Sequence, residues 1–137
     1  MSLDFSPLEK SLAALERSLQ VVAECAAPEG SDLQNTLRAG VVQNFEVAYE
    51  LSWKMMKRWL EQNAEPDVDG VSRRQLFRLC YENRLIDEVD AWMHFHRSRN
   101  ETSHTYNQST AEKVFAVAEP FFREAQKVLL RLQERND

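Results

Sequence analysis

Apolar residues recur at alternating spacings of three and four along most of this 137-residue chain, and that repeat places side chains on one face of an α-helix. The first such stripe consists of Leu8, Leu12, Leu15, Leu19, Val22 and Ala26, and the last consists of Val114, Ala118, Phe121, Ala125, Val128 and Leu132. The pattern predicts long helices over residues 6–26, 32–63, 87–100 and 110–135, and a short helix over residues 73–83. No segment shows the alternation of a β-strand. We therefore expect an all-α fold, an up-and-down bundle of four long helices plus one short helix, in a single domain over residues 1–137.

The expected helix over residues 32–63 carries two apolar stripes. One stripe consists of Leu37, Val41, Phe45, Ala48, Ser52, Met55 and Trp59, and its neighbour consists of Val42, Tyr49, Trp53, Met56 and Leu60. A helix with two apolar stripes packs against two neighbours, or against a core and a partner chain.

Serine begins three expected helices. Ser6, Ser72 and Ser109 are each followed three residues later by Glu or Gln, which is the pattern of a capping box, and Ser31 or Asp32 can cap the helix over residues 32–63.

Composition narrows the class of protein. The net charge of −5 argues against a broad nucleic-acid-binding surface, so any contact with RNA must be local. No apolar run approaches the length of a membrane span, and the first ten residues lack the features of a signal peptide. Cys25 and Cys80 lie far apart in helix-like sequence and are expected to be buried free thiols, which fits a reducing cytoplasm.

One polar stretch, "RSRNETSHTYN" at residues 97–107, interrupts the apolar pattern, and all three histidines fall within residues 94–104. The stretch can be an ordinary junction, because Asn, Ser and Thr satisfy the free backbone groups at helix ends. It is also richer in side-chain donors than a junction requires. Arg99 and His104 together suit phosphate chemistry, because arginine binds phosphate oxygens in pairs and histidine exchanges protons near pH 7.

A metal site is not expected here. His94 and His96 would lie roughly 200° apart around a helix, no HExxH motif is present, and no cysteine is near. His96 falls on an apolar stripe and is interpreted as a hydrogen-bonded core histidine.

Other polar and aromatic residues receive plain structural interpretations. The basic residues Lys54, Lys57, Arg58, Arg73, Arg74 and Arg78 are interleaved with acids and are interpreted as a solvated face. Trp53, Met55 and Trp59 are expected in the core or an interface. Glu46 and Glu50 are interpreted as exposed charge.

The string "RNETSHTYN" resembles the motif of the nucleotidyltransferase substrate-binding proteins, which belong to the HEPN group together with the HepT toxins. That motif is Arg, a polar residue, three further residues and His, and it matches Arg99, Asn100 and His104; the HepT-type extension His-x-Tyr adds Tyr106. The all-helical pattern and the length agree over nearly the whole chain.

This resemblance implies a HEPN-type homodimer that pairs with a minimal nucleotidyltransferase encoded by a neighbouring gene. In relatives that are RNases, cleavage needs no metal and no cofactor: His104 would act as acid and base, Arg99 would stabilise the transition state, and Asn100 would orient the pair. DNA would not be cut, because the 2′-hydroxyl is the nucleophile. Tyr106 would be the residue that the transferase adenylylates.

Two hypotheses follow. In the first, the protein is a nucleotide- or substrate-binding partner of the transferase in a toxin–antitoxin-like module, and the residues that contact nucleotide or RNA are Arg97, Arg99, Ser103 and His104. In the second, the protein is a metal-independent RNase toxin that adenylylation of Tyr106 neutralises.

Overall fold

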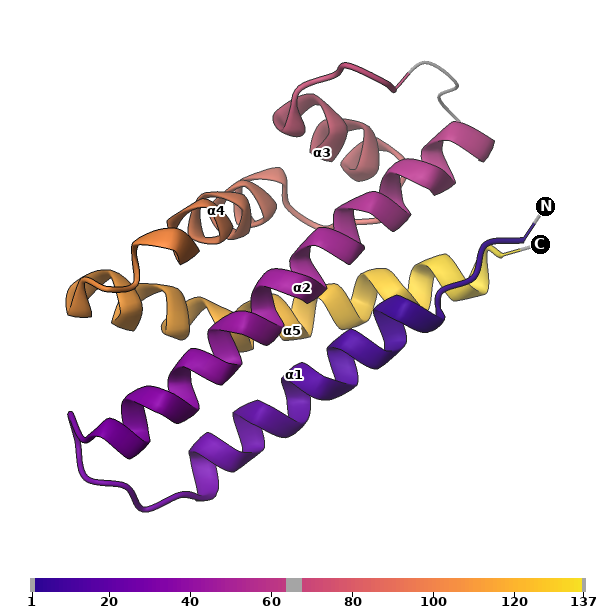
Figure 1. The fold of residues 1–137 in the computed structure, drawn as a ribbon. Coiled ribbons are helices and arrows are strands. Elements are labelled where there is room, and N and C mark those ends of the chain that lie inside the picture. The colour runs from indigo at the N-terminus through magenta and orange to yellow at the C-terminus, as the bar shows by residue number, and fades with distance from the viewer. Residues whose placement is uncertain (1, 64–67, 137) are drawn as a thin grey trace.

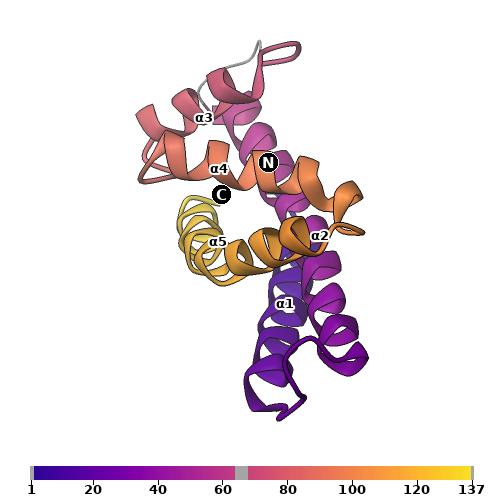
Figure 2. The same cartoon turned by 90° about the vertical axis from the view of Figure 1, so that its left-hand side faces the viewer.

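The chain folds as a bundle of helices in a computed structural model that describes residues 2–63 and 68–136. The helices are α1 (Ser6–Glu24), α2 (Asp32–Asn63), α3 (Arg73–Glu82), α4 (Val89–Asn100), the 3-10 helix η1 (Glu101–His104) and α5 (Gln108–Glu134). The described residues contain no strand, and the predicted all-α fold is confirmed. α1 and α2 form an antiparallel pair, α5 packs against both, α3 packs against α2 and α4, and α4 lies against α2 and α5 (Figures 1 and 2). None of the described helices is long and apolar enough to cross a membrane.

The core centres on aromatic rings from α2, α4 and α5. The ring of Phe121 meets Phe45 at a centroid distance of 5.0 Å and Phe95 at 5.4 Å, both edge to face, and Phe95 meets Trp92 at 5.2 Å. Edge-to-face pairs of this kind contribute about 0.5–1.5 kcal/mol beyond the burial of their area. The aromatic cluster therefore fixes α4 against α2 and α5, and α4 carries the candidate site.

Both apolar stripes of α2 are used within the chain. The helix contacts α1, α3, α4 and α5. Phe45 from the first stripe and Tyr49 from the second are both fully buried. Packing of both stripes against helices of the same chain is therefore observed, and packing of α2 against a partner chain stays a prediction.

Two helix starts follow the serine pattern. The hydroxyl oxygen of Ser72 accepts from the backbone N–H of Gln75 at 3.1 Å, and that of Ser31 accepts from Gln34 at 3.2 Å. Each bond satisfies a backbone donor that the first turn of a helix leaves free.

The capping boxes predicted at Ser6 and Ser109 are wrong. Ser6 already lies within α1, and its hydroxyl donates to Asp4 at 2.6 Å. Asn107 caps α5 two residues before Ser109, with its side-chain oxygen accepting from Thr110 N–H at 3.2 Å. Asn caps a helix as well as Ser does. The cap is therefore Asn107, because this residue has the extended backbone conformation of an N-cap directly before α5.

Helix α4 begins two residues later than the sequence pattern predicts. The pattern places its start at Asp87, but the carboxylate of Asp87 pairs with Arg131 at 2.8 Å and Lys127 at 3.3 Å, both on α5. Because the Asp87 carboxylate is bound to α5, it does not cap the first turn of α4. At the other end, α4 stops at Asn100, as predicted.

Candidate functional site

The polar stretch 97–107 forms the last turn of α4, all of η1 and the turn into α5. It does serve as a junction, since Asn107 caps α5. Its side chains, however, also enter contacts with α2 that a junction does not need. Arg99 and Thr102 face α2, whereas His104 and Tyr106 are exposed.

Arg99 is held by two glutamates of α2. Its Nε donates to Glu50 Oε1 at 3.1 Å, and its Nη1 lies 3.9 Å from Glu46 Oε2 and 3.4 Å from the Thr102 hydroxyl oxygen. The Thr102 hydroxyl in turn lies 2.6 Å from Glu46 Oε2, to which it donates. The interpretation of Glu46 and Glu50 as merely exposed charge is wrong, because the two carboxylates orient the arginine of the motif.

These contacts orient Arg99 more than they stabilise the fold. The side chains of Arg99 and Glu50 are 30% and 32% exposed, and ion pairs so open to solvent contribute at most about 1 kcal/mol. Within the described residues, Arg99 Nη2 makes no hydrogen bond. One edge of the guanidinium is therefore anchored, and Nη2 can donate to a phosphate oxygen.

A second network runs through His96. Arg73 Nη1 donates to the Tyr49 hydroxyl oxygen at 3.1 Å, and that hydroxyl lies 2.9 Å from His96 Nδ1. The hydrogen bond between Tyr49 and His96 can run in either direction, according to which ring nitrogen of His96 carries the proton. Nε2 lies 3.5 Å from the side-chain amide of Asn100, the polar residue of the motif.

Burial sets the protonation of this network. It lowers the pKa of His96 below its ordinary value of 6.5, and the positive charge of Arg73 lowers it further. Burial likewise raises the pKa of Tyr49 to about 12. His96 is thus a hydrogen-bonded histidine at the edge of the core, as predicted, and it also connects the core to Asn100.

Glu50 joins the two networks. Its Oε2 accepts from Trp53 Nε1 at 3.0 Å, and the Arg73 guanidinium lies over the Trp53 ring at 3.6 Å. Arg73 therefore departs from the solvated face predicted for its basic neighbours. That prediction does hold for Arg74, which is exposed and pairs with Asp90 at 3.6 Å.

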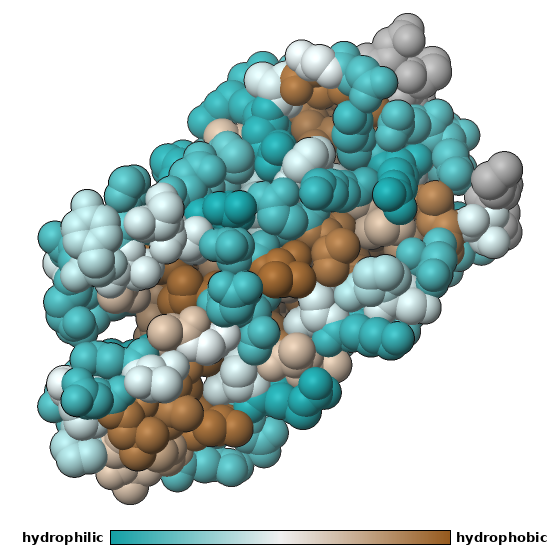
Figure 3. Space-filling model, in the orientation of Figure 1, coloured by the Kyte–Doolittle hydropathy of each residue, from teal (hydrophilic) through white to brown (hydrophobic). Residues whose placement is uncertain are grey.

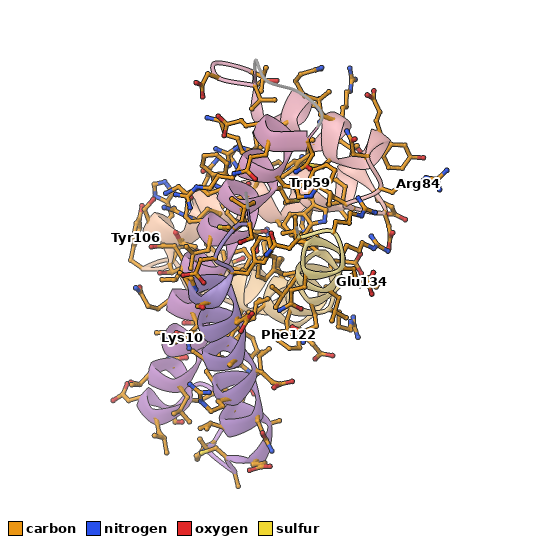
Figure 4. The ribbon with its side chains drawn as sticks, turned by 90° about the vertical axis from the view of Figure 1, so that its right-hand side faces the viewer. Lys10, Trp59, Arg84, Tyr106, Phe122 and Glu134 are labelled. Atoms are coloured by element: carbon orange, nitrogen blue, oxygen red, sulfur yellow. The ribbon has the colours of Figure 1, made fainter. Side chains whose placement is uncertain are left out.

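His104 and Tyr106 lie side by side on the outside of the molecule. Their ring centroids are 6.1 Å apart, edge to face, and Tyr106 is 87% exposed. Figure 4 shows Tyr106 at the outer edge of the molecule, away from the helix axes. Ser103 is exposed in the same turn. Tyr106 is therefore open to solvent in this chain.

Arg97 belongs to a different surface. It lines a pocket of about 580 Å³ between α4 and α5, together with His94, Lys113 and Pro120. The predicted binding set is therefore divided: Arg99 faces α2, His104 and Ser103 lie in the adjoining turn, and Arg97 lies on another side of α4.

Four residues of the networks were missed by reasoning from sequence, namely Glu46, Tyr49, Glu50 and Arg73. The available signal was the four-residue spacing of Glu46 and Glu50 beside the stripe that contains Tyr49. Among the described residues, no group of three or more His, Cys, Asp or Glu side chains is arranged to hold a metal ion.

Comparison with known proteins identifies the family that has this helical fold. A family model described as nucleotidyltransferase substrate binding protein like matches residues 3–134, and the chain belongs to this family. It is 34% identical to a Haemophilus influenzae protein called probable ribonuclease HepT, over 98% of this chain and 94% of that protein.

Two solved structures have the same fold. A Haemophilus influenzae structure described as the fold of a substrate binding domain of a nucleotidyltransferase has a TM-score of 0.88 and 33% identity, over 95% of this chain and 99% of that one. A Thermus thermophilus structure has a TM-score of 0.72 and 28% identity, over 91% of this chain and 98% of that one.

Proposed function

We propose that this protein is the nucleotide-binding partner subunit of a minimal nucleotidyltransferase, acting as a homodimer in a two-gene module. The observation that carries the proposal is the placement of Arg99. Glu46 and Glu50 anchor one edge of its guanidinium, Nη2 stays available, and the exposed His104 lies in the following turn. Such an arrangement suits a phosphate group at the surface.

The transferase as partner is supported by the family description and by the Haemophilus influenzae structure described as a substrate binding domain. In this role Arg99 and His104 bind the phosphate of a nucleotide or nucleic acid strand. No bond is broken by this chain, and chemistry belongs to the transferase.

A second candidate function is metal-independent RNA cleavage. It is favoured by the exposed His104 beside Tyr106 and by the relative called probable ribonuclease HepT. The ribose 2′-oxygen would lose its proton and bond to phosphorus, the bond from phosphorus to the 5′-oxygen would break, and the leaving oxygen would take up a proton. His104 would exchange these protons, Arg99 would stabilise the charge on phosphorus, and Asn100 would help to orient them.

Adenylylation of Tyr106 would switch off either activity. The Tyr106 hydroxyl would attack the α-phosphorus of ATP and pyrophosphate would leave, so that a negatively charged adenylyl group remains two residues from His104. Charge and bulk at this position would repel the phosphate of an RNA strand.

The binding role is tested by titrating the purified protein with AMP and by measuring complex formation with the transferase. Arg99→Ala should weaken AMP binding at least tenfold, because a charge-assisted contact is lost. Arg97→Ala is the matched control, since Arg97 lies on the same helix and faces another pocket. Equal losses for both variants would contradict a site at Arg99.

Cleavage is tested by incubating RNA with the wild type in EDTA, beside His104→Ala. His94→Ala is the matched control, because His94 is an exposed histidine that lines the pocket with Arg97. Cleavage that only His104→Ala abolishes would establish the RNase. No cleavage by a folded wild type that still binds the transferase would leave the binding role alone.

A further inference from the structure

A cavity of about 340 Å³ lies next to the anchored arginine, between the N-terminal half of α2, η1 and the first turns of α5. Figure 3 shows the surface hollowed between the end of the molecule where α4, η1 and α5 meet and the nearby end of the α1–α2 pair. Glu46 and Thr102 line this cavity, and both also lie within 4 Å of Arg99. A group bound in the cavity would therefore sit one side chain away from the phosphate position proposed above.

The lining of the cavity combines flat apolar surface with neutral hydrogen-bonding groups. Ala39, Val42 and Ala111 provide the apolar part. The side-chain amides of Asn35, Gln43 and Gln108 provide both donors and acceptors.

Arg38 adds unused donors to this cavity. Only 24% of its side chain is exposed, yet it makes no hydrogen bond within the described residues. Its Nε is buried without a partner, and its nearest carboxylate, on Glu29, is 3.9 Å away, which is too long for a hydrogen bond. The guanidinium packs over the Phe115 ring at 4.8 Å instead. A half-buried arginine without hydrogen-bond acceptors is unusual, and an acceptor on a ligand beside its Nη atoms would supply one.

The charges around the cavity select against phosphate as its occupant. Glu46 and Glu112 line it and Glu29 lies near Arg38, so the acids outnumber the single arginine. A neutral planar ring that carries both donors and acceptors fits this lining better than a phosphate group, for which the free Nη2 of Arg99 is the donor outside the cavity.

We propose that this cavity is the nucleobase subsite of the nucleotide whose phosphate is bound at Arg99. The carboxylates of Glu46 and Glu112 can only accept hydrogen bonds, so they favour a base with an exocyclic amino group. Adenine, guanine and cytosine carry that group, whereas the base of UMP offers only its ring N3–H as a donor. The subsite rests on the proposed function for the phosphate at Arg99, but its base contacts are separately testable.

The experiment measures the binding of AMP, UMP and ribose 5-phosphate by isothermal titration calorimetry. AMP should bind at least fivefold more tightly than UMP and tenfold more tightly than ribose 5-phosphate. Gln43→Leu and Gln108→Leu should each weaken AMP about fivefold, the loss expected for one hydrogen bond, and leave ribose 5-phosphate within twofold. Gln126→Leu is the matched control, because Gln126 is an exposed glutamine on α5 that does not line the cavity.

Saturation-transfer NMR with AMP supplies a second readout that needs no variant. The base protons should receive more saturation than the ribose protons, since the base is the enclosed part. AMP binding that is lost in Arg99→Ala but unchanged in both glutamine variants would overturn the subsite and leave the proposed function standing. Failure of AMP, UMP and ribose 5-phosphate to bind folded protein would overturn both.

Discussion

At the scale of single residues, His96 should make the stability of the protein depend on pH. Burial and the charge of Arg73 lower its pKa in the folded state, while the carboxylate of Glu50 opposes this. The unfolded chain, with a histidine pKa of about 6.5, therefore binds the proton more readily. The stability that neutral His96 contributes is fully present above pH 6.5 and is lost as pH falls from there through the lower pKa of the folded state.

Urea unfolding at pH 7.5 and pH 5 measures this effect. His96→Gln should lose less free energy of unfolding than the wild type between these two pH values, because it has no imidazole to protonate. His94→Gln is the control, since His94 is exposed on the same helix, and it should lose as much as the wild type. If His96→Gln lost as much free energy of unfolding as the wild type between these pH values, the pH dependence would come from another group.

The two cysteines should differ in reactivity. Cys80 is fully buried, and burial raises its pKa to about 12, so thiolate is scarce at pH 8. Cys25 is only half-buried, against the prediction that both thiols lie in the core. A thiol-reactive reagent should therefore modify Cys25 in the native protein and Cys80 only after unfolding. Cys25→Ser retains only Cys80, and Cys80→Ser retains only Cys25. Equal rates of thiol modification in these two native variants would contradict this difference.

In the candidate site, the residues that are close together in the sequence could be predicted, and those that meet only in the fold could not. Arg99, Asn100 and His104 lie within six positions, so a local string identifies them. Glu46 and Glu50 are about 50 positions away from Arg99, and their contact with it exists only once α2 and α4 have packed. A glutamate on a helix surface looks like solvated charge until its partner is placed, which is why the prediction failed there.

At the scale of helices, the start of α5 can be tested by comparing two neighbouring residues. Asn107→Ala removes the side-chain oxygen that caps Thr110 N–H and should cost about 1 kcal/mol of unfolding free energy. Ser109→Ala, at the position that the capping-box pattern indicates, should change stability by less than about 0.5 kcal/mol, because Ser109 is exposed within the helix.

Chemical denaturation of both variants gives the comparison. A larger loss for Ser109→Ala would mean that α5 starts later than described. The periodic pattern predicted every α-helix, since burial of one face decides whether such a helix forms, but not η1, which has no buried residue. It missed the start of α5, because Asn and Ser compete for the cap on nearly equal terms and tertiary geometry decides between them.

At the scale of the whole molecule, the bundle is unevenly packed. The buried residues of α1 end at Leu15 and those of α2 begin at Val41, so residues 16–40 contain none. Figure 2 shows this end of the α1–α2 pair extending beyond the other helices. The apolar stripe continues there through Leu19 and Val22, and Val21 and Leu33 are about half exposed. The pattern along the chain predicts the helices correctly, but it cannot show that α5 covers only part of their length.

Hydrogen–deuterium exchange measures the consequence. Opening a segment without buried residues costs less free energy than global unfolding, so amides in residues 16–40 should exchange faster than those in residues 45–60. Mass spectrometry of peptides from the two segments, at low protein concentration, gives the comparison. Equal protection at every concentration would contradict the uneven packing. Protection of residues 16–40 that appears only as concentration rises would instead show that a second copy covers this end, because only association depends on concentration.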